Sequence, residues 1–288
     1  MNIERTMRRF LCEAWYMPAD QFSLMLQTAA LAVATFGRET LVGAAGRVTS
    51  DDGKYMPLEK RVEMHSNNVA VVPVEGVIGL GWDDWEKRMG GMDVEELCCV
   101  LSDLAQAPKV KAIVLNINSP GGLVTGTPEC AEHIAALAQV KPIFVWTNTM
   151  IASAAYFIAA GATAIYSSAS ALVGSIGVYL PLLDISGLYE KLGLKVELFK
   201  SGALKGAGYP GVALTDEQRE HFQEHVQHAF TAFRDHVKAY RQHVEDDCMQ
   251  GQCMWGDQAQ AAGLVDSIAC MEQAICDAGQ YADLMAEH

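Results

Sequence analysis

Short apolar runs that alternate with amphipathic helical segments constrain this chain most. Val69 to Val74, Ala112 to Ile117 and Pro142 to Thr147 are apolar runs of strand length, and polar residues or glycine follow each of them. Asp93 to Ala105 and Thr127 to Ala138 lie between these runs and have helical spacing. Uninterrupted apolar strands are typical of sheets that helices cover on both faces. The sequence therefore predicts a layered α/β fold with a mostly parallel sheet.

The same alternation continues towards residue 200, and helical patterns then take over. The long helix should begin at the capping residues Thr215 to Gln218 and run to about His243, and a last helix-rich segment should follow it. The other expected elements are a helix over Ala154–Ala160, a strand over Ala164–Ser167, a helix over Asp184–Lys191 and a strand over Lys195–Phe199.

The first 64 residues differ in pattern from the rest. A helix is expected to open at Pro18 and to run to about Thr35, and a polar, glycine-containing link follows over residues 37–53. We therefore predict a helical N-terminal prefix with a linker over residues 1–64. A second domain should cover residues 65–288, with its C-terminal helices starting at about residue 214.

Charge and cysteine content exclude several classes of protein. The net charge of −14 argues against a nucleic-acid or membrane surface as the main role. The eight cysteines contain no C-x-x-C pair, which is typical of reduced thiols in the cytoplasm, and no zinc site is expected. The apolar run Leu24 to Phe36 is too short to cross a bilayer. We expect a cytoplasmic protein without a membrane span.

Ser153 is the first candidate for chemistry. It lies in the stretch T-M-I-A-S-A-A-Y, after the strand-like run Ile143 to Trp146 and before the helical run Ala154 to Ala160. A serine at such a junction lies beside helix N-terminal amides, which favour negative charge and suit the nucleophile of an acyl-transfer enzyme. Serine is also a common helix N-cap, so this position alone leaves both interpretations open.

Two further segments could complete such a site. Asn118-Ser119-Pro120-Gly121-Gly122 ends a buried strand, where bare glycine amides can stabilise an oxyanion, although a simple Pro-Gly turn would have the same sequence. Lys200 and Lys205 follow the last expected strand, and a lysine that burial keeps neutral can act as a base. His133 has no evident partner. His221, His225 and His228 share a helix face that could bind a metal, but a packed or solvated face fits them better.

Four segments in succession resemble the signal peptide peptidase A (protease IV) family of serine proteases. They are N-S-P-G-G (118–122), M-I-A-S-A-A-Y-F-I-A (150–159), L-V-G-S-I-G-V (172–178) and F-K-S-G-A-L-K-G-A-G (199–208). The resemblance covers about residues 68–270. It implies a Ser-Lys endopeptidase with a ClpP/crotonase-like layered fold and no metal or other cofactor.

The resemblance also implies a role for each matching residue. Ser153 matches the nucleophile, Lys205 the general base and Ser175 the serine that orients the lysine. The amides of Gly122 and Ala154 match the oxyanion donors. Many bacterial members have two glycines after the nucleophile, whereas this chain has alanines, which keep the N–H groups.

The N-terminal prefix refines the resemblance. Trp15-Tyr16-Met17-Pro18 and the apolar helix after it resemble the phage and prophage members, which are capsid-assembly (prohead) proteases. This branch implies capsid or scaffold protein as substrate. It also implies a homo-oligomer in which serine and lysine can come from neighbouring subunits. The alternatives are a soluble signal-peptide-peptidase-like protease of general peptide degradation, a crotonase-like acyl-CoA enzyme, and a scaffold protein that has lost the chemistry.

Overall fold

The structure is a computed structural model that describes residues 15–16, 49–50, 54–88 and 90–287. The helix expected from Pro18 to about Thr35 and most of the link over residues 37–53 lie outside the described residues.

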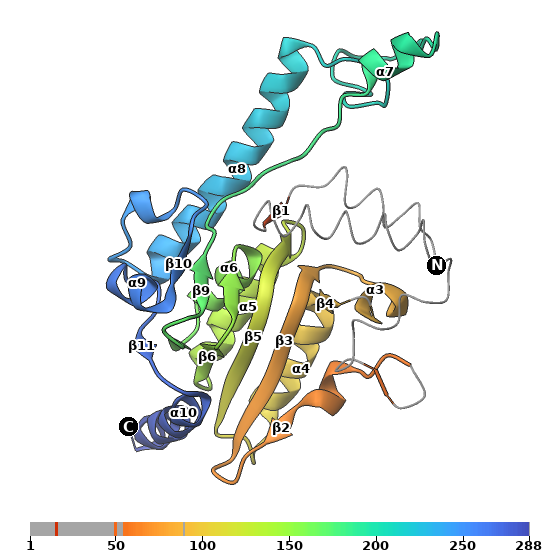
Figure 1. The fold of residues 1–288 in the computed structure, drawn as a ribbon. Coiled ribbons are helices and arrows are strands. Elements are labelled where there is room, and N and C mark those ends of the chain that lie inside the picture. The colour runs from red at the N-terminus through yellow and green to blue at the C-terminus, as the bar shows by residue number, and fades with distance from the viewer. Residues whose placement is uncertain (1–14, 17–48, 51–53, 89, 288) are drawn as a thin grey trace.

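A mostly parallel sheet forms the body of the protein, as the sequence predicts (Figure 1). Its central strand is β5, which pairs in parallel with β3 along one edge and with β6 and then β7 along the other. The sheet therefore divides at β5 into one branch, β6-β8-β11, and another, β7-β9-β10. The strands are β1 (Trp15–Tyr16), β2 (Glu63–Met64), β3 (Val69–Gly79), β4 (Gly91–Asp93), β5 (Ala112–Leu123), β6 (Ile143–Thr147), β7 (Met150–Ala152), β8 (Ala164–Ser167), β9 (Leu172–Gly174), β10 (Cys253–Trp255) and β11 (Ser267–Ile268).

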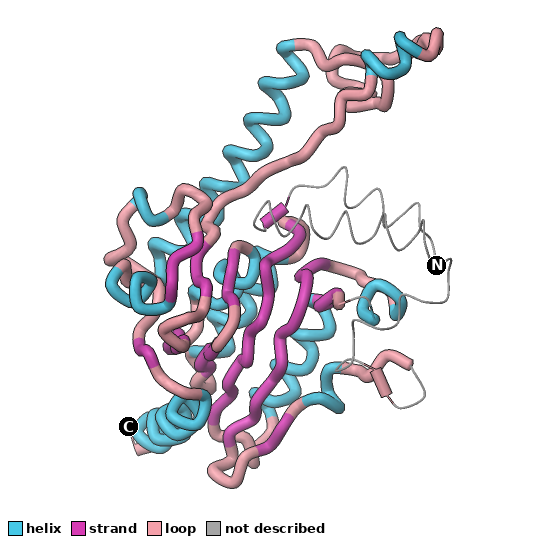
Figure 2. Tube along the Cα trace, viewed as in Figure 1, coloured by secondary structure: helices cyan, strands magenta, loops and turns pink. Residues whose placement is uncertain are grey.

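Helices cover both faces of the main sheet, which explains why its strands are apolar throughout (Figure 2). Ile113 and Leu115 of β5 point into the larger core with α4, α5 and α6, whereas Ala112 and Val114 pack in a second core with α10. The helices are η3 (Leu58–Arg61), α3 (Asp84–Arg88), α4 (Val94–Gln106), α5 (Thr127–Ala138), α6 (Ala154–Ala160), α7 (Ser186–Lys191), α8 (Asp216–Tyr240), η4 (Asp246–Cys248), α9 (Gly256–Ala261) and α10 (Met271–Ala286).

The segment from about residue 179 to the middle of α8 projects from the body, and we call it the arm (Figure 1). α8 begins with the predicted capping box of Thr215 and Gln218, and its residues Phe233 and Val237, near the other end, are buried. The strand expected over Lys195–Phe199 is wrong. That segment lies on the arm, no strand pairs with it among the described residues, and Phe199 is 92% exposed.

Most other predicted elements are present. The helices Thr127–Ala138 and Ala154–Ala160 and the strand Ala164–Ser167 have the expected bounds. β3 and β5 are longer than expected, because they continue to pair with each other beyond the apolar run.

The residues just before position 65 contact the main body. Leu58 is fully buried in the larger core, and Glu63 and Met64 of β2 pair with β3. The division into a 1–64 prefix and a 65–288 domain stays a prediction.

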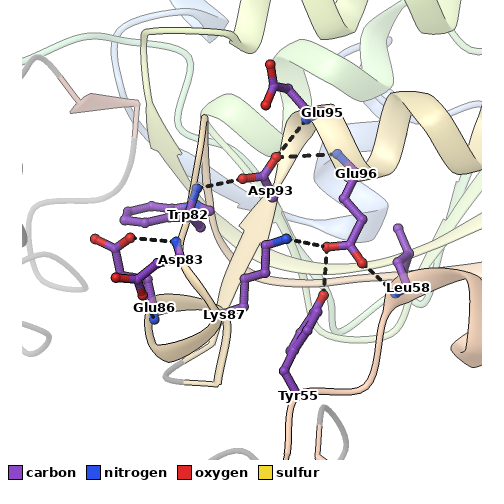
Figure 3. Close-up of polar contacts among 9 residues, drawn as sticks. All are labelled: Tyr55, Leu58, Trp82, Asp83, Glu86, Lys87, Asp93, Glu95 and Glu96. Atoms are coloured by element: carbon purple, nitrogen blue, oxygen red, sulfur yellow. Dashed lines mark hydrogen bonds and ion pairs between the residues drawn. The ribbon is translucent and has the colours of Figure 1, made fainter. Parts of the chain in front are cut away.

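A polar network at the start of α4 fixes the connection that follows β3 (Figure 3). Asp93 caps α4 by accepting bonds from the N–H groups of Glu95 and Glu96, and it also accepts a 2.6 Å bond from the Trp82 N–H. Glu96 accepts bonds from the Tyr55 hydroxyl (2.8 Å) and the Leu58 N–H (2.7 Å), and its carboxylate lies 2.9 Å from the Lys87 ammonium.

This network makes stability depend on pH. Burial alone would raise the pKa of Glu96, but the bonds from Leu58, Lys87 and Tyr55 outweigh burial and hold that pKa below its ordinary value. A lowered carboxyl pKa stabilises the fold above the ordinary value of 4.5. That contribution is lost as the pH falls through the folded-state pKa.

We predict that Glu96→Gln lowers the free energy of unfolding by about 1–3 kcal/mol at pH 7. The difference from wild type should shrink as the pH falls below 4.5. Urea unfolding at several pH values measures it. Glu95→Gln, on the exposed side of the same turn, is the control and should change little. A Glu96→Gln difference that is constant down to low pH would contradict the prediction.

Candidate active site

Ser153 lies at a strand-to-helix junction, as the sequence predicts. The strand that leads into it is β7, however, which the sequence did not predict, and not β6. β7 pairs in parallel with β9 through Ala152 and Gly174, and the Ser153 N–H donates a 2.7 Å bond to the Gly174 carbonyl oxygen. The backbone therefore turns sharply from strand to helix at a position that the neighbouring strand fixes.

The turn places Ser153 in a strained conformation. Its φ is 55° and its ψ is −118°, a region that glycine adopts easily and residues with a side chain seldom do. The other non-glycine residues with positive φ in the described part of the chain are Asn68 and Ser175. Strained backbone tends to gather at functional sites. Two of these three residues are ones that the sequence resemblance singles out.

The Ser153 side chain is fully buried, and its Oγ has no hydrogen-bond partner within the described residues. Every residue of α6, from Ala154 to Ala160, is also buried. A buried hydroxyl normally has a partner, because an unpaired one loses its bonds to water. This hydroxyl is therefore available to a group other than those that the described residues supply.

The N-S-P-G-G segment forms the last part of β5, whereas the sequence predicts that the strand runs to Ile117 and that this segment ends it. The strand continues to Leu123 because β3 follows it, with Ile78 opposite Gly122 and a register shift beside Gly121, whose φ is 103°. Ser119 stabilises this bulge by donating a 2.6 Å bond to the Gly76 carbonyl and accepting one from the Gly121 N–H.

Gly122 is packed too tightly for a side chain. A Cβ atom there would lie 1.8 Å from the Ile78 carbonyl oxygen. Ser119 of β5 pairs in parallel with Ile151 of β7. Gly121 and Ser153 each follow two residues later, so they lie at the same position along the strand direction. Gly122, Ser153 and Ala154 therefore lie together at one edge of the sheet.

Ser175 lies at the same edge, one residue after the end of β9. It is 4% exposed, and its N–H donates a 2.7 Å bond to the Gln252 carbonyl oxygen. Ala152 at the end of β7 pairs with Gly174 at the end of β9. The residues that follow these two strands, Ser153 and Ser175, are therefore neighbours. The sheet thus brings together four of the five predicted site residues.

The fifth residue, Lys205, lies elsewhere in the chain. It is exposed, in the turns between α7 and the start of α8. The segment that connects these two helices lies at the outer end of the arm (Figure 1). The buried Phe233 follows Asp216 by seventeen helical positions, which corresponds to about 25 Å along α8. Lys200, the other candidate, lies in the same turns and donates a 2.8 Å bond to the Ala203 carbonyl.

α8 connects the arm to the helix that follows Ser153. Arg241, just after α8, donates bonds to the Ala160 and Ala162 carbonyls at the end of α6, and it pairs with Asp266 at 2.7 Å. Sequence reasoning missed Arg241, because nothing in its local pattern separates it from a surface charge.

Aromatic packing joins the same two helices. Phe157 of α6 stacks on Phe233 and His236 of α8, each with ring centroids 4.7 Å apart. Burial lowers the pKa of His236 to about 4, so this ring is neutral near pH 7. The position of the arm is therefore tied to α6 through packed rings and through Arg241.

Comparison with known proteins assigns the family. The model of Peptidase family S49 matches residues 135–285, more than half of the chain. The chain belongs to peptidase family S49. This confirms the resemblance stated from the motifs, and the mixed α/β architecture agrees with the ClpP-like fold of S49 peptidases.

Individual S49 relatives come from phages and from bacteria. Capsid assembly protease C of Escherichia phage lambda is 31% identical over 229 residues, which cover 78% of this chain and 51% of that protein. Protease 4 of Salmonella typhi is 31% identical over 224 residues (76% and 35%). Head-tail preconnector protein GP5 of Enterobacteria phage P21 is 30% identical over 207 residues (68% and 40%). This chain thus spans about half of the lambda protein and less of the other two.

In contrast to the apolar strands, the helices of this S49 chain are short or amphipathic. None of the helices within the described ranges has the length and apolar character needed to cross a membrane.

We predict that the strain at Ser153 makes glycine a better replacement than alanine. Ser153→Gly should be more stable than Ser153→Ala by about 1–2 kcal/mol, because glycine adopts φ 55° without a steric cost. Urea unfolding of the two variants measures the difference. The control is the same two substitutions at the exposed Ser170, where φ is not positive. There Ser170→Ala should be more stable than Ser170→Gly. A more stable alanine at both positions would contradict the prediction.

Proposed function

We propose that this protein is a serine endopeptidase in which Ser153 is the nucleophile and Lys205 the general base. The observation that carries the proposal is the buried Ser153 hydroxyl, held in a strained turn beside Gly122 and Ser175 and without a partner among the described residues. Membership of family S49 supports peptidase activity.

In the proposed reaction, neutral Lys205 takes the proton of the Ser153 hydroxyl as its oxygen attacks the scissile carbonyl carbon. The N–H groups of Gly122 and Ala154 stabilise the oxyanion. The Lys205 ammonium then protonates the leaving amine, and an acyl-enzyme remains on Ser153. Water hydrolyses this ester, and Lys205 again accepts and returns a proton. Ser175 orients the lysine, and no metal or other cofactor takes part.

We propose that Lys205 reaches Ser153 of a neighbouring copy. Lys205 is exposed on the arm, which projects away from the sheet and from α6, the helix that follows Ser153 (Figure 1). The arm also exposes large apolar side chains. Burial of these side chains against a second copy would stabilise an oligomer, and burial of the lysine would favour its neutral form. The exposed apolar residues of the arm are Leu182, Leu183, Leu188, Leu192, Leu194, Phe199, Leu204 and Tyr209.

For the substrate, we propose capsid or scaffold protein during phage or prophage head assembly, in the cytoplasm of a bacterial host. The names of the lambda and P21 relatives support this choice. Protease 4 of Salmonella typhi supports a second candidate, a protease of general peptide degradation. Membership of family S49 argues against an acyl-CoA enzyme.

Mixed oligomers test the dyad and its division between subunits. We predict that Ser153→Ala and Lys205→Ala each abolish cleavage of an unfolded protein and of the capsid protein encoded next to this gene. Co-expression of the two variants should restore about a quarter of wild-type activity, because a ring of mixed subunits pairs an intact serine with an intact lysine in about one site in four. Intact-mass analysis of the products measures cleavage and locates the cut sites.

Lys200→Ala is the matched control, since Lys200 lies in the same turns and should be dispensable. If Lys200→Ala were inactive while Lys205→Ala still cut, the assignment of the base would be wrong. Inactive mixtures of two singly inactive variants would mean that serine and lysine act within one chain. No cleavage by the wild-type oligomer would favour a scaffold protein that has lost the chemistry.

A further inference from the structure

β1 joins the end of the central strand from a distant part of the sequence. Trp15 and Tyr16 pair antiparallel with Leu123 and Gly122 of β5 (Figure 1). More than a hundred residues separate the two strands in the chain, and Gly122 is the residue whose amide we assign to the oxyanion.

The register places β1 beside Ser153. β3 occupies one edge of β5 at Gly121 and Gly122, so β1 must pair along the opposite edge. β7 occupies this second edge at Ser119, and the chain turns away from it at Ser153, level with Gly121. β1 therefore takes the edge of β5 at the point where β7 leaves it.

An extended peptide substrate needs the same edge. Peptides commonly bind by adding a strand to an open sheet edge, through backbone hydrogen bonds. In the proposed reaction the scissile carbonyl must lie next to Ser153 with its oxygen towards the Gly122 N–H. A substrate in that position and β1 cannot both pair with Gly122.

We propose that β1 occupies, within its own chain, the strand position of the peptide substrate, so that the N-terminal segment limits substrate binding. The inference rests on the proposed function, because that function places the substrate at Gly122. Two paired residues form few hydrogen bonds, yet an intramolecular strand has a high effective concentration. β1 therefore lowers the apparent affinity for substrate and leaves the chemical step unchanged.

Proline substitution in β1 tests the proposal in the full chain. Proline lacks the N–H that a paired strand needs, so Trp15→Pro/Tyr16→Pro should release the edge of β5. With an unfolded protein as substrate, KM should fall about tenfold while kcat stays the same, because the competent fraction rises. Trp15→Ala/Tyr16→Ala keeps both backbone N–H groups and should change KM much less. An unchanged KM in the proline variant, or equal effects of the two variants, would overturn the proposal.

A second measurement does not depend on catalysis. In a Ser153→Ala background, hydrogen exchange of the segment Asn118–Val124 should be faster with the two prolines than without them. A synthetic peptide with the sequence of Glu13 to Asp20 should bind the proline variant and restore slow exchange. Faster exchange with the prolines and its reversal by the peptide would show that β1 occupies the edge of β5. If wild type then had no peptidase activity, the proposed function alone would be refuted. Unchanged exchange and no peptide binding would refute the inference even in an active enzyme.

Discussion

The pairing of β5 on both edges is the constraint on which the rest of the structure depends. One edge carries β3 along most of its length, and the other carries β6, β7 and β1 in turn. Gly122 makes this possible, because any side chain there would collide with the Ile78 backbone. The register of β5 with β7 then fixes where Ser153 lies along β5, and the register of β7 with β9 brings Ser175 beside Ser153.

Burial and backbone strain act together at Ser153. The strand-to-helix turn forces a positive φ, and the buried α6 prevents the turn from relaxing. Strain of this kind costs about 1–3 kcal/mol and persists only where the surroundings enforce it. Here the bonds from Arg241 to the end of α6 and the packing of Phe157 on α8 supply that enforcement.

The body and the arm have opposite surface character. The body buries its apolar strands on both faces, whereas the arm exposes Leu183 and Phe199 at 79% and 92%. A projecting segment with so much apolar surface is typical of an interface with another chain. In the proposed oligomer, α8 would connect the interface on the arm to α6, and so to the surroundings of Ser153.

The sequence by itself determined the elements whose signal is local. The apolar runs, helix caps and glycine positions were sufficient for α5, α6 and β8 and for placing Ser153 at a strand-to-helix junction. Only the tertiary structure decided the extension of β5, the failure of the Lys195–Phe199 strand, the role of Arg241 and the pairing of β1. Each of these depends on a neighbour, present or missing, from a distant part of the chain, and local pattern carries no information about such neighbours. The separation of Lys205 from Ser153 has the same origin, because motif order along the chain does not fix where an arm points.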